Sequence, residues 1–180
     1  MKPFLEGKII NLRPLTLADV DGNYINWLND SEVCKYNSHH AYPYNRELAV
    51  KYIEDRQESK KDLALAIVTK TKKPNHIGNI ALQNIDYISR NAEYAIILGE
   101  KEYWGKGIAK EASILILRHG FTTLNLHRIY CGTSSENIAM QKLAAFLGMK
   151  EEGRRKEALY KNGKYVDIIE YGLLRKNFKT

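Results

Sequence analysis

The sequence predicts a mixed α/β domain, and three observations support this class. Segments with strand patterns alternate with helical ones in the order strand, two helices, three strands, helix, strand, helix, two strands. The 180 residues are 44% hydrophobic and 27% charged, which is typical of a globular protein with its own core. The chain has no repeat, low-complexity tract or Pro/Gly/Ser-rich linker, so we expect residues 1–180 to form a single domain.

The first third of the chain predicts one strand and two helices. Residues 7–14 are an apolar run that ends at a proline, which favours a strand. Residues 16–19 supply a helix cap, and the apolar positions of residues 20–28 recur at helical spacing. A second helical pattern covers residues 46–57. Residues 36–44, between the two helices, are aromatic and irregular, so we expect a loop there.

The middle of the chain predicts three strands followed by a long helix. Residues 63–69, 77–85 and 92–98 are apolar or alternating runs separated by turn signals. Residues 105–121 then have helical periodicity. The expected buried stripe of this helix is Ile108, Ala109, Ala112, Leu115, Ile116 and His119.

The C-terminal segment predicts a strand, a helix and a closing hairpin. The strand covers residues 128–133, and the helix covers residues 137–147 and ends at Gly148, which suits a left-handed cap. Two further strands flank Asn162-Gly163, a dipeptide that favours a tight hairpin turn. The inward side chains of the last strand are expected to be either Tyr165, Asp167, Ile169 and Tyr171 or the opposite set.

The charge pattern narrows the class of partner. The 28 Lys and Arg against 21 Asp and Glu give a net charge of +7, which suits nucleic acid, an acidic membrane surface or a phosphate-bearing molecule. Basic residues are scattered among acidic ones, and no block of five or six like charges occurs. We therefore expect no nucleic-acid partner.

Targeting signals and cysteines point to the cytoplasm. No stretch approaches the roughly 18 apolar residues of a membrane helix, and the N-terminus lacks the apolar core of a signal peptide. Cys34 and Cys131 are then expected to be reduced, buried thiols. No His/Cys set has metal-ligand spacing, so we expect no metal.

The start of the long helix carries the most informative motif. Gly105 and Gly107 stand one residue apart at the predicted helix start, where backbone N–H groups and the helix dipole favour a negative ligand such as a diphosphate. A dinucleotide fingerprint would need a third glycine at the position of Lys110, and the Gly-Lys-Ser/Thr of a P-loop is absent.

Four segments together resemble a known family. They are residues 103–112 (YWGKGIAKEA), residues 126–129 (LHRI) with Asn137 and residues 146–149 (FLGM), residues 27–36, and the closing hairpin over residues 160–174. In these the sequence resembles the GNAT family of N-acetyltransferases, and within it the ribosomal-protein (Rim-type) branch. The resemblance implies a mostly antiparallel sheet that splays at an acetyl-CoA cleft and is flanked by helices.

The resemblance also implies which residues hold acetyl-CoA. Backbone groups of Ile96, Ile97 and Leu98 would meet the pantetheine arm, and Asn137 would contact the same arm. The alternatives are that the three strand residues belong only to the core and that Asn137 is only a helix cap. The amides that would hold the pyrophosphate belong to Gly105, Lys106, Gly107, Ile108, Ala109 and Lys110.

Acetyl transfer to an amine needs a base, because a protonated amine cannot attack a thioester. Glu93 is the candidate, since it opens the strand that leads to the cofactor and the Rim-type pattern favours an acidic residue there. The alternative is that Glu93 points to solvent at a strand end. A strand N–H near Ile97 would stabilise the developing oxyanion.

No general acid can be assigned by resemblance. Many family members have a tyrosine where this chain has Ala144, and Rim-type members often have a serine where it has Met140. Ser134, Ser135 and Tyr160 are conjectural substitutes, and solvent is another proton source.

The acceptor side is assigned to the aromatic loop. An irregular segment rich in Tyr and His beside a cleft often touches a ligand, although surface packing is the alternative. The residues expected to line the acceptor are Tyr36, His39, His40 and Tyr42.

The leading hypothesis is an enzyme that moves acetyl from acetyl-CoA to a primary amine by direct attack in a ternary complex. A protein N-terminus and a nucleotide-linked amino sugar both stay open as the acceptor, and a homodimer stays open as the assembly. The alternative is a CoA-binding sensor or partner module without catalysis, because the usual acid positions hold Ala144 and Met140.

Overall fold

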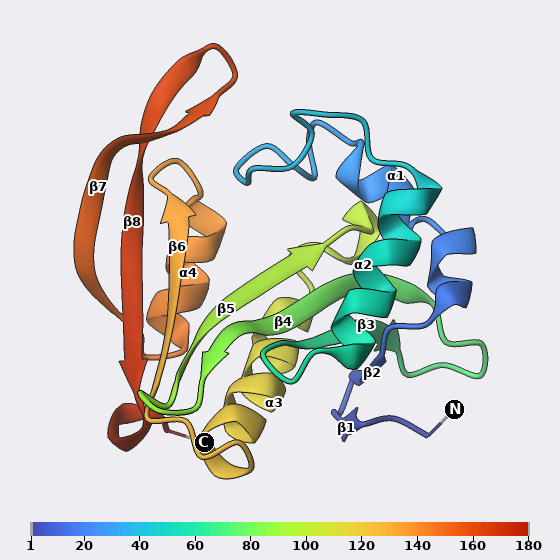
Figure 1. The fold of residues 1–180 in the computed structure, drawn as a ribbon, viewed down its shortest axis with the longest axis horizontal. Coiled ribbons are helices and arrows are strands. Elements are labelled where there is room, and N and C mark those ends of the chain that lie inside the picture. Colours follow the sequence, from blue (N-terminus) through green and yellow to red (C-terminus); the bar gives the residue numbers. More distant parts are fainter. Residues whose placement is uncertain (1, 180) are drawn as a thin grey trace.

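The computed structural model describes residues 2–179, and their strands join one eight-stranded sheet in the order β1-β2-β3-β4-β5-β6-β8-β7 (Figure 1). All neighbouring strands are antiparallel except β5 and β6, which are parallel. The mixed, mostly antiparallel sheet expected above is thus confirmed. The strands are β1 (Leu5–Glu6), β2 (Ile10–Pro14), β3 (Leu63–Thr69), β4 (His76–Asp86), β5 (Asn91–Leu98), β6 (Arg128–Ser134), β7 (Lys150–Lys161) and β8 (Lys164–Leu174).

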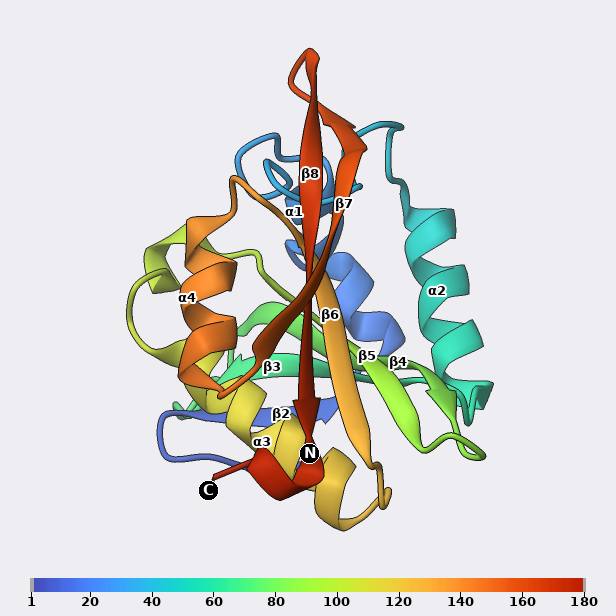
Figure 2. The same cartoon turned by 90° about the vertical axis from the view of Figure 1, so that its left-hand side faces the viewer.

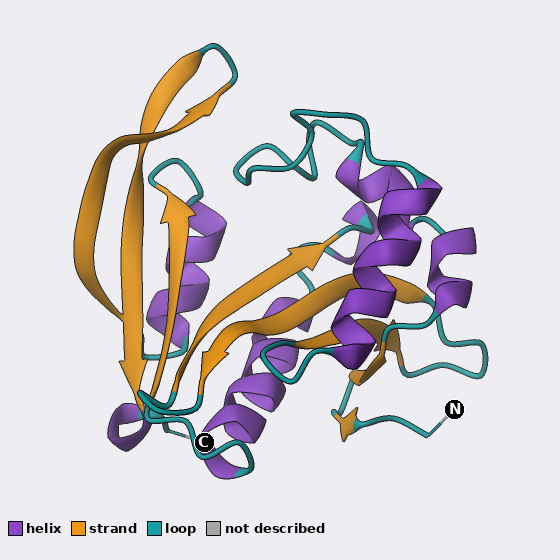
Figure 3. Ribbon diagram, in the orientation of Figure 1, coloured by secondary structure: helices purple, strands orange, loops and turns teal. Residues whose placement is uncertain are grey.

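Helices cover both faces of this sheet (Figure 3). The α-helices are α1 (Tyr24–Leu28), α2 (Arg46–Glu58), α3 (Ile108–Thr122) and α4 (Ile138–Phe146). Three short 3-10 helices are η1 (Leu17–Asp21), η2 (Lys101–Tyr103) and η3 (Arg175–Asn177). In the view of Figure 1, α2 lies in front of the sheet and α3 lies behind it. Within residues 2–179 no helix is long and apolar enough to cross a membrane.

Two apolar clusters hold the layers together, one on each face. Behind the sheet, Ile116 and Leu117 of α3 pack with strand residues such as Leu82. In front, Trp27 of α1 and Ile53 of α2 pack against residues of β3 and β5. Each such fully buried side chain contributes roughly 1.5–3 kcal/mol, so both faces of β5 are held in place.

The helix expected over residues 20–28 is interrupted. Thr16 and Asp19 form a capping box that starts η1 instead of an α-helix, and the chain turns extended at Gly22. Helix α1 restarts only at Tyr24. The two-residue strand β1, which pairs with β2, was not predicted, because so short an edge strand carries no periodic signal.

The long helix begins three residues later than expected. Gly105 and Gly107 have φ of +73° and +79°, a left-handed conformation that an α-helix excludes, so α3 starts at Ile108. Of the expected stripe, Ile108, Ala112 and Ile116 are buried, whereas Ala109, Leu115 and His119 are only partly buried. Ser113, Leu117, Gly120 and Phe121 complete the buried face.

Neither alternation expected for the last strand holds along its whole length. Ile169 and Tyr171 are buried, but Tyr165 is 65% exposed and Asp167 lies in surface ion pairs. Val166, from the opposite set, is buried. The reason is that the β7–β8 hairpin projects beyond the helices that cover the sheet (Figure 2), so its tip has no layer to face.

Candidate active site

The parallel strands β5 and β6 stay together for only three residues. Asn91, Ala92 and Glu93 pair with residues 128–130, and beyond this point β5 follows β4 while β6 follows β8. The two strands therefore diverge, as Figure 1 shows. We call this opening, between residues 94–98 of β5 and residues 131–134 of β6, the β5–β6 fork. Along it no strand of residues 2–179 pairs with this edge of β5, so its backbone polar groups are available to a ligand.

Residues 99–107, which we call the glycine loop, lead from the end of β5 into α3. A Cβ atom added at Gly105 or Gly107 would meet no atom of the described residues within 4 Å, so open space lies over both positions. The first backbone bond of the helix runs from Glu111 N to Gly107 O at 3.1 Å, which leaves the N–H groups of residues 108–110 outside the helical ladder. The loop is braced by Trp104, whose Nε1 donates to Leu98 O at 2.8 Å.

Two lysines add positive charge to this loop. The Lys106 ammonium lies 5.5 Å from the ring centroid of Tyr103, and the Lys110 ammonium lies 4.5 Å from that of Phe146. Orphan N–H groups, a helix N-terminus, two lysines and space over the glycines together fit a diphosphate. The predicted cofactor residues from Gly105 to Lys110 are thus brought together at one end of the fork.

The remaining predicted cofactor residues flank the fork. Ile96 and Leu98 pack against the cluster behind the sheet and Ile97 against the one in front, so the side chains serve the core and only the backbone faces the fork. Asn137, on the β6 side, is the N-cap of α4, with Oδ1 accepting from Met140 N at 3.1 Å. The cap uses the amide oxygen and leaves the Nδ2 group for a ligand.

Glu93 lies at the narrow end of the fork, as the last β5 residue paired with β6. Its Oε2 accepts from Asn84 Nδ2 at 3.2 Å, and Tyr130 stands opposite it on β6. A second carboxylate, that of Glu170 on β8, lies beside Gly132, where an added Cβ would be 3.2 Å from Oε2, while its Oε1 accepts from Arg155 Nε at 2.6 Å. Burial raises the pKa of Tyr130, and the charges of Glu93 and Glu170 raise it further, so both carboxylates lie near this phenol.

The face on which Glu93 lies follows from strand alternation. Its neighbour Tyr94 points behind the sheet, where its hydroxyl contacts the Ser113 hydroxyl of α3 at 2.6 Å. Glu93 therefore points to the front, the face on which α1 and α2 pack. The glycine loop and α3 approach from behind the sheet. The expected cofactor side and the expected base, Glu93, therefore lie on opposite faces of the fork.

The family's two usual acid positions carry no titratable proton. Ala144 is fully buried and Met140 is partly buried against the rear cluster. Among the substitutes, Ser134 is buried with its Oγ accepting from Glu136 N at 3.2 Å, and the Ser135 carbonyl accepts from Gln141. Tyr160 lies at the exposed hairpin tip and packs on Tyr165, with ring centroids 4.9 Å apart.

The loop over residues 36–44 reaches the β7–β8 hairpin. Lys161 Nζ donates to the His39 carbonyl at 2.6 Å, and partial desolvation together with this ammonium lowers the pKa of the His39 imidazole. His39, His40 and Tyr42 line a cavity of about 190 Å³ under the loop, but Tyr36 does not. The residues assigned to the acceptor thus only partly gather in one place.

Two charged residues at the start of the glycine loop escaped the sequence analysis. Glu100 Oε1 accepts from Trp27 Nε1 at 3.0 Å and from Asn23 Nδ2 at 2.8 Å. Lys101 Nζ lies 2.9 Å from Asp30 and 2.6 Å from Glu32. They tie the cofactor loop to α1 and the segment after it. These contacts span more than 60 residues, and no spacing rule reveals them.

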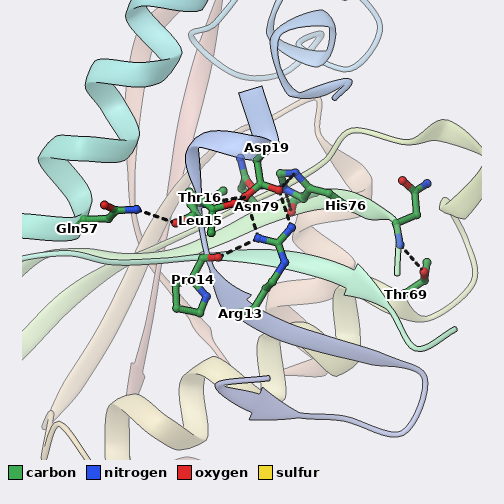
Figure 4. A network of polar contacts seen from close by, with 11 residues as sticks. Arg13, Pro14, Leu15, Thr16, Asp19, Gln57, Thr69, His76 and Asn79 are labelled. Carbon is green, nitrogen blue, oxygen red and sulfur yellow. Dashed lines mark hydrogen bonds and ion pairs between the residues drawn. The ribbon is translucent and has the colours of Figure 1, made fainter. Parts of the chain in front are cut away.

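A part-buried polar network joins β2, η1 and β4 next to α1 (Figure 4). Arg13 donates to both oxygens of Asp19, at 2.8 and 2.5 Å, and the Thr16 N–H donates to the same carboxylate. His76 Nδ1 lies 3.3 Å from Asp19, and the His76 ring meets the edge of Trp27 at 4.9 Å. Trp27, which reaches Glu100, is therefore held from two sides.

Comparison with known proteins agrees with this geometry. A family model described as an acetyltransferase (GNAT) domain matches residues 10–150. A spermidine N(1)-acetyltransferase of Vibrio cholerae is 31% identical over 173 residues, which is 94% of this chain and 95% of that protein.

Solved structures resemble the chain over nearly its whole length. The spermidine N-acetyltransferase of Vibrio cholerae in complex with CoA and spermine has a TM-score of 0.86 at 28% identity, covering 95% of this chain and 98% of that one. RimJ of Mycobacterium smegmatis, in complex with CoA-disulfide, has a TM-score of 0.83 at 19% identity, covering 95% and 84%, and so shares the fold.

Proposed function

Because the chain belongs to the GNAT family of acetyltransferases, we propose that it acetylates one amine of a small polyamine-type acceptor. Acetyl-CoA is the acetyl donor, and the product classes are CoA and an N-acetylated amine. The observation that carries the choice of acceptor is the pair of carboxylates, Glu93 and Glu170, beside Tyr130 on the front face of the fork.

The charges at the narrow end of the fork support an oligocation. Two unit charges 4 Å apart attract by about 1 kcal/mol in water and by about 4 kcal/mol at an effective dielectric constant near 20. A polyamine can present one neutral amine to the thioester and keep its other ammonium groups near Glu170. Similarity to spermidine N-acetyltransferases points the same way. A protein N-terminus carries one such amine, so it gains less from the second carboxylate.

The chain's own groups account for the steps of direct transfer. In this proposal Glu93 removes the amine proton, directly or through one water, because only the neutral amine attacks. The partnerless edge of β5 near Ile97 donates N–H groups to the developing oxyanion. Acetyl-CoA supplies its acetyl group as a thioester, so a C–N bond forms as the C–S bond breaks. The leaving sulfur takes its proton from solvent, since positions 140 and 144 offer none.

A free-thiol release assay with acetyl-CoA tests the proposal against three acceptor classes. We expect spermidine to have a kcat/KM at least about tenfold above that of a peptide N-terminus or an amino sugar, because one further ion pair in a partly desolvated site supplies ~1.4 kcal/mol. Faster turnover of a peptide or an amino sugar would overturn the acceptor class. CoA binding with no turnover across the panel would favour the sensor alternative.

The same assay tests the carboxylate that carries the choice of acceptor. The Glu170→Gln variant should raise the KM for spermidine by roughly fivefold, equivalent to ~1 kcal/mol, with little change for a monoamine of similar length. Glu54→Gln, which removes an exposed carboxylate on α2, is the matched control. Equal effects of Glu170→Gln on both acceptors would remove Glu170 from acceptor binding.

A further inference from the structure

The first turn of α3 is tied to the other end of the chain by one carboxylate. Glu111 Oε1 accepts from Lys8 N at 2.5 Å, and Oε2 accepts from Ile9 N at 3.0 Å and from Ile10 N at 3.1 Å. Three consecutive backbone N–H groups of the β1–β2 turn therefore close around a side chain that stands four residues after Gly107. A carboxylate that accepts several N–H bonds is among the stronger protein hydrogen-bonding groups.

The turn is shaped to admit this carboxylate. A Cβ atom at Gly7 would lie 2.6 Å from the Ile10 carbonyl oxygen and 3.0 Å from Glu111 Cδ, so only glycine allows the approach. On its other side the turn is held by Lys70, whose Nζ donates to Gly7 O at 3.0 Å and to Glu6 at 2.8 Å. The contact is thus fixed by Lys70, the residue that follows β3, as well as by the turn.

From this geometry we infer that Glu111 is a positioning residue for the diphosphate of acetyl-CoA. Its carboxylate fixes the first turn of α3 against the sheet edge, and with it the N–H groups of residues 108–110. Trp104 braces the loop at its β5 end, but no described atom lies within 4 Å of a Cβ added at Gly105 or Gly107, so the end of the loop next to α3 depends on the helix for its position. Orphan N–H groups bind a diphosphate well only when they are held in place beforehand.

The Glu111→Gln substitution tests this positioning role separately from the ligand contacts. It keeps the length of the side chain, but its NH2 group would face the N–H groups of the turn donor to donor, so the start of α3 must shift. Binding that depends on the diphosphate should weaken, and contacts of the pantetheine arm along β5 should not. The inference rests on the proposed placement of the diphosphate at the glycine loop.

The test compares two ligands that differ in the diphosphate. Calorimetry should give a CoA Kd roughly tenfold higher for Glu111→Gln than for the wild type, with the Kd for pantetheine unchanged. Steady-state kinetics should agree, with a higher KM for acetyl-CoA, an unchanged kcat, and an unchanged kcat/KM for S-acetylpantetheine. The control is Glu47→Gln, which removes an exposed first-turn glutamate from α2 and should alter neither ligand.

The outcomes separate this inference from the function on which it rests. A wild-type protein that binds CoA no better than pantetheine contradicts the diphosphate site itself. A wild type that prefers CoA, together with an unchanged CoA Kd in Glu111→Gln or an equal loss for both ligands, overturns only the role of Glu111. If Glu111→Gln does not fold, Glu111→Asp decides, since its shorter carboxylate should weaken CoA binding selectively by a smaller factor.

Discussion

At the scale of single residues, Glu93 is distinguished by its position at the end of the β5–β6 pairing. It is the last residue of β5 that pairs with β6, and strand alternation turns its side chain to the front face. Its carboxylate has a neutral partner, the amide of Asn84, rather than a cation. Among the described residues Glu93 thus makes no ion pair, and its place at the apex of the opening suits the role of base proposed above.

Replacing this carboxylate tests its role as base. We expect Glu93→Gln to lower kcat/KM by roughly 10²-fold near pH 7, within the range for general-base catalysis. The loss should shrink as the pH rises towards about 10, where the amine deprotonates without help. A pH–rate profile measured against wild type and Glu54→Gln checks this, and a loss that is the same at every pH would exclude Glu93 as base.

At the scale of elements, η1 is held to the sheet by the Asp19 carboxylate. Burial alone would raise the pKa of Asp19, but hydrogen bonds from Arg13 and His76 and from the Thr16 N–H outweigh burial and hold the pKa well below its ordinary range. A depressed folded-state pKa means that this group stabilises the fold above the unfolded pKa of about 3.9. The contribution is lost progressively as the pH falls below that value.

The Asp19→Asn substitution should therefore destabilise the protein, and more so at neutral than at acidic pH. We expect Asp19→Asn to lower the free energy of unfolding by roughly 3 kcal/mol near pH 7, since it leaves the half-buried Arg13 without its charge partner. The deficit should narrow below about pH 4. Urea denaturation from pH 3 to 7 measures it. The exposed ion pair of Asp21 with Arg46 gives the control Asp21→Asn, expected within about 0.5 kcal/mol of wild type, and a deficit independent of pH would contradict the account.

At the scale of the whole molecule, the proposed cofactor site joins parts of the chain that have few other contacts. The fork separates β1–β5, with α1 to α3, from the unit of β6, β7, β8 and α4, and only three paired residues of β5 connect the two in the sheet. Helix α3, which packs on β4, β5 and β6, and the contact of Lys161 with the His39 carbonyl add to this connection. A ligand that touches β5, the glycine loop and α4 would hold both halves together.

Saturating CoA should accordingly raise the melting temperature. A ligand that binds only the folded state at 100 times its Kd adds about 2.7 kcal/mol, which corresponds to roughly 5–10 °C for a domain of this size. Thermal unfolding followed by circular dichroism, with and without CoA, measures the shift. Pantetheine at the same concentration should give a smaller one, and an unchanged melting temperature with CoA would contradict the cofactor site.

The local parts of this description follow from sequence patterns. Periodicity and turn chemistry predict nearly every strand and helix, because each signal lies within about 15 consecutive residues. The spacing of Gly105 and Gly107 predicts an anion-binding loop for the same reason. Two predictions were wrong. A capping box at Thr16 and Asp19 interrupts the helix before Tyr24. The tip of the hairpin has no covering layer, so its side chains do not follow the expected alternation.

Tertiary structure alone decided which residues distant in the sequence meet around the site. Glu93 and Glu170 both lie near Tyr130, Glu111 accepts from the turn at Lys8, and Lys101 reaches Asp30, although the last two pairs are 103 and 71 residues apart in the sequence. The carboxylates meet at Tyr130 because β8 pairs with β6 and β6 pairs with the start of β5, and the other two contacts follow from the packing of α3 and α1 on the sheet. The sequence by itself determined the helices and strands, the family resemblance and the glycine loop. The order of the strands in the sheet decided which charges surround the site, because that order depends on the pairing of all the strands together.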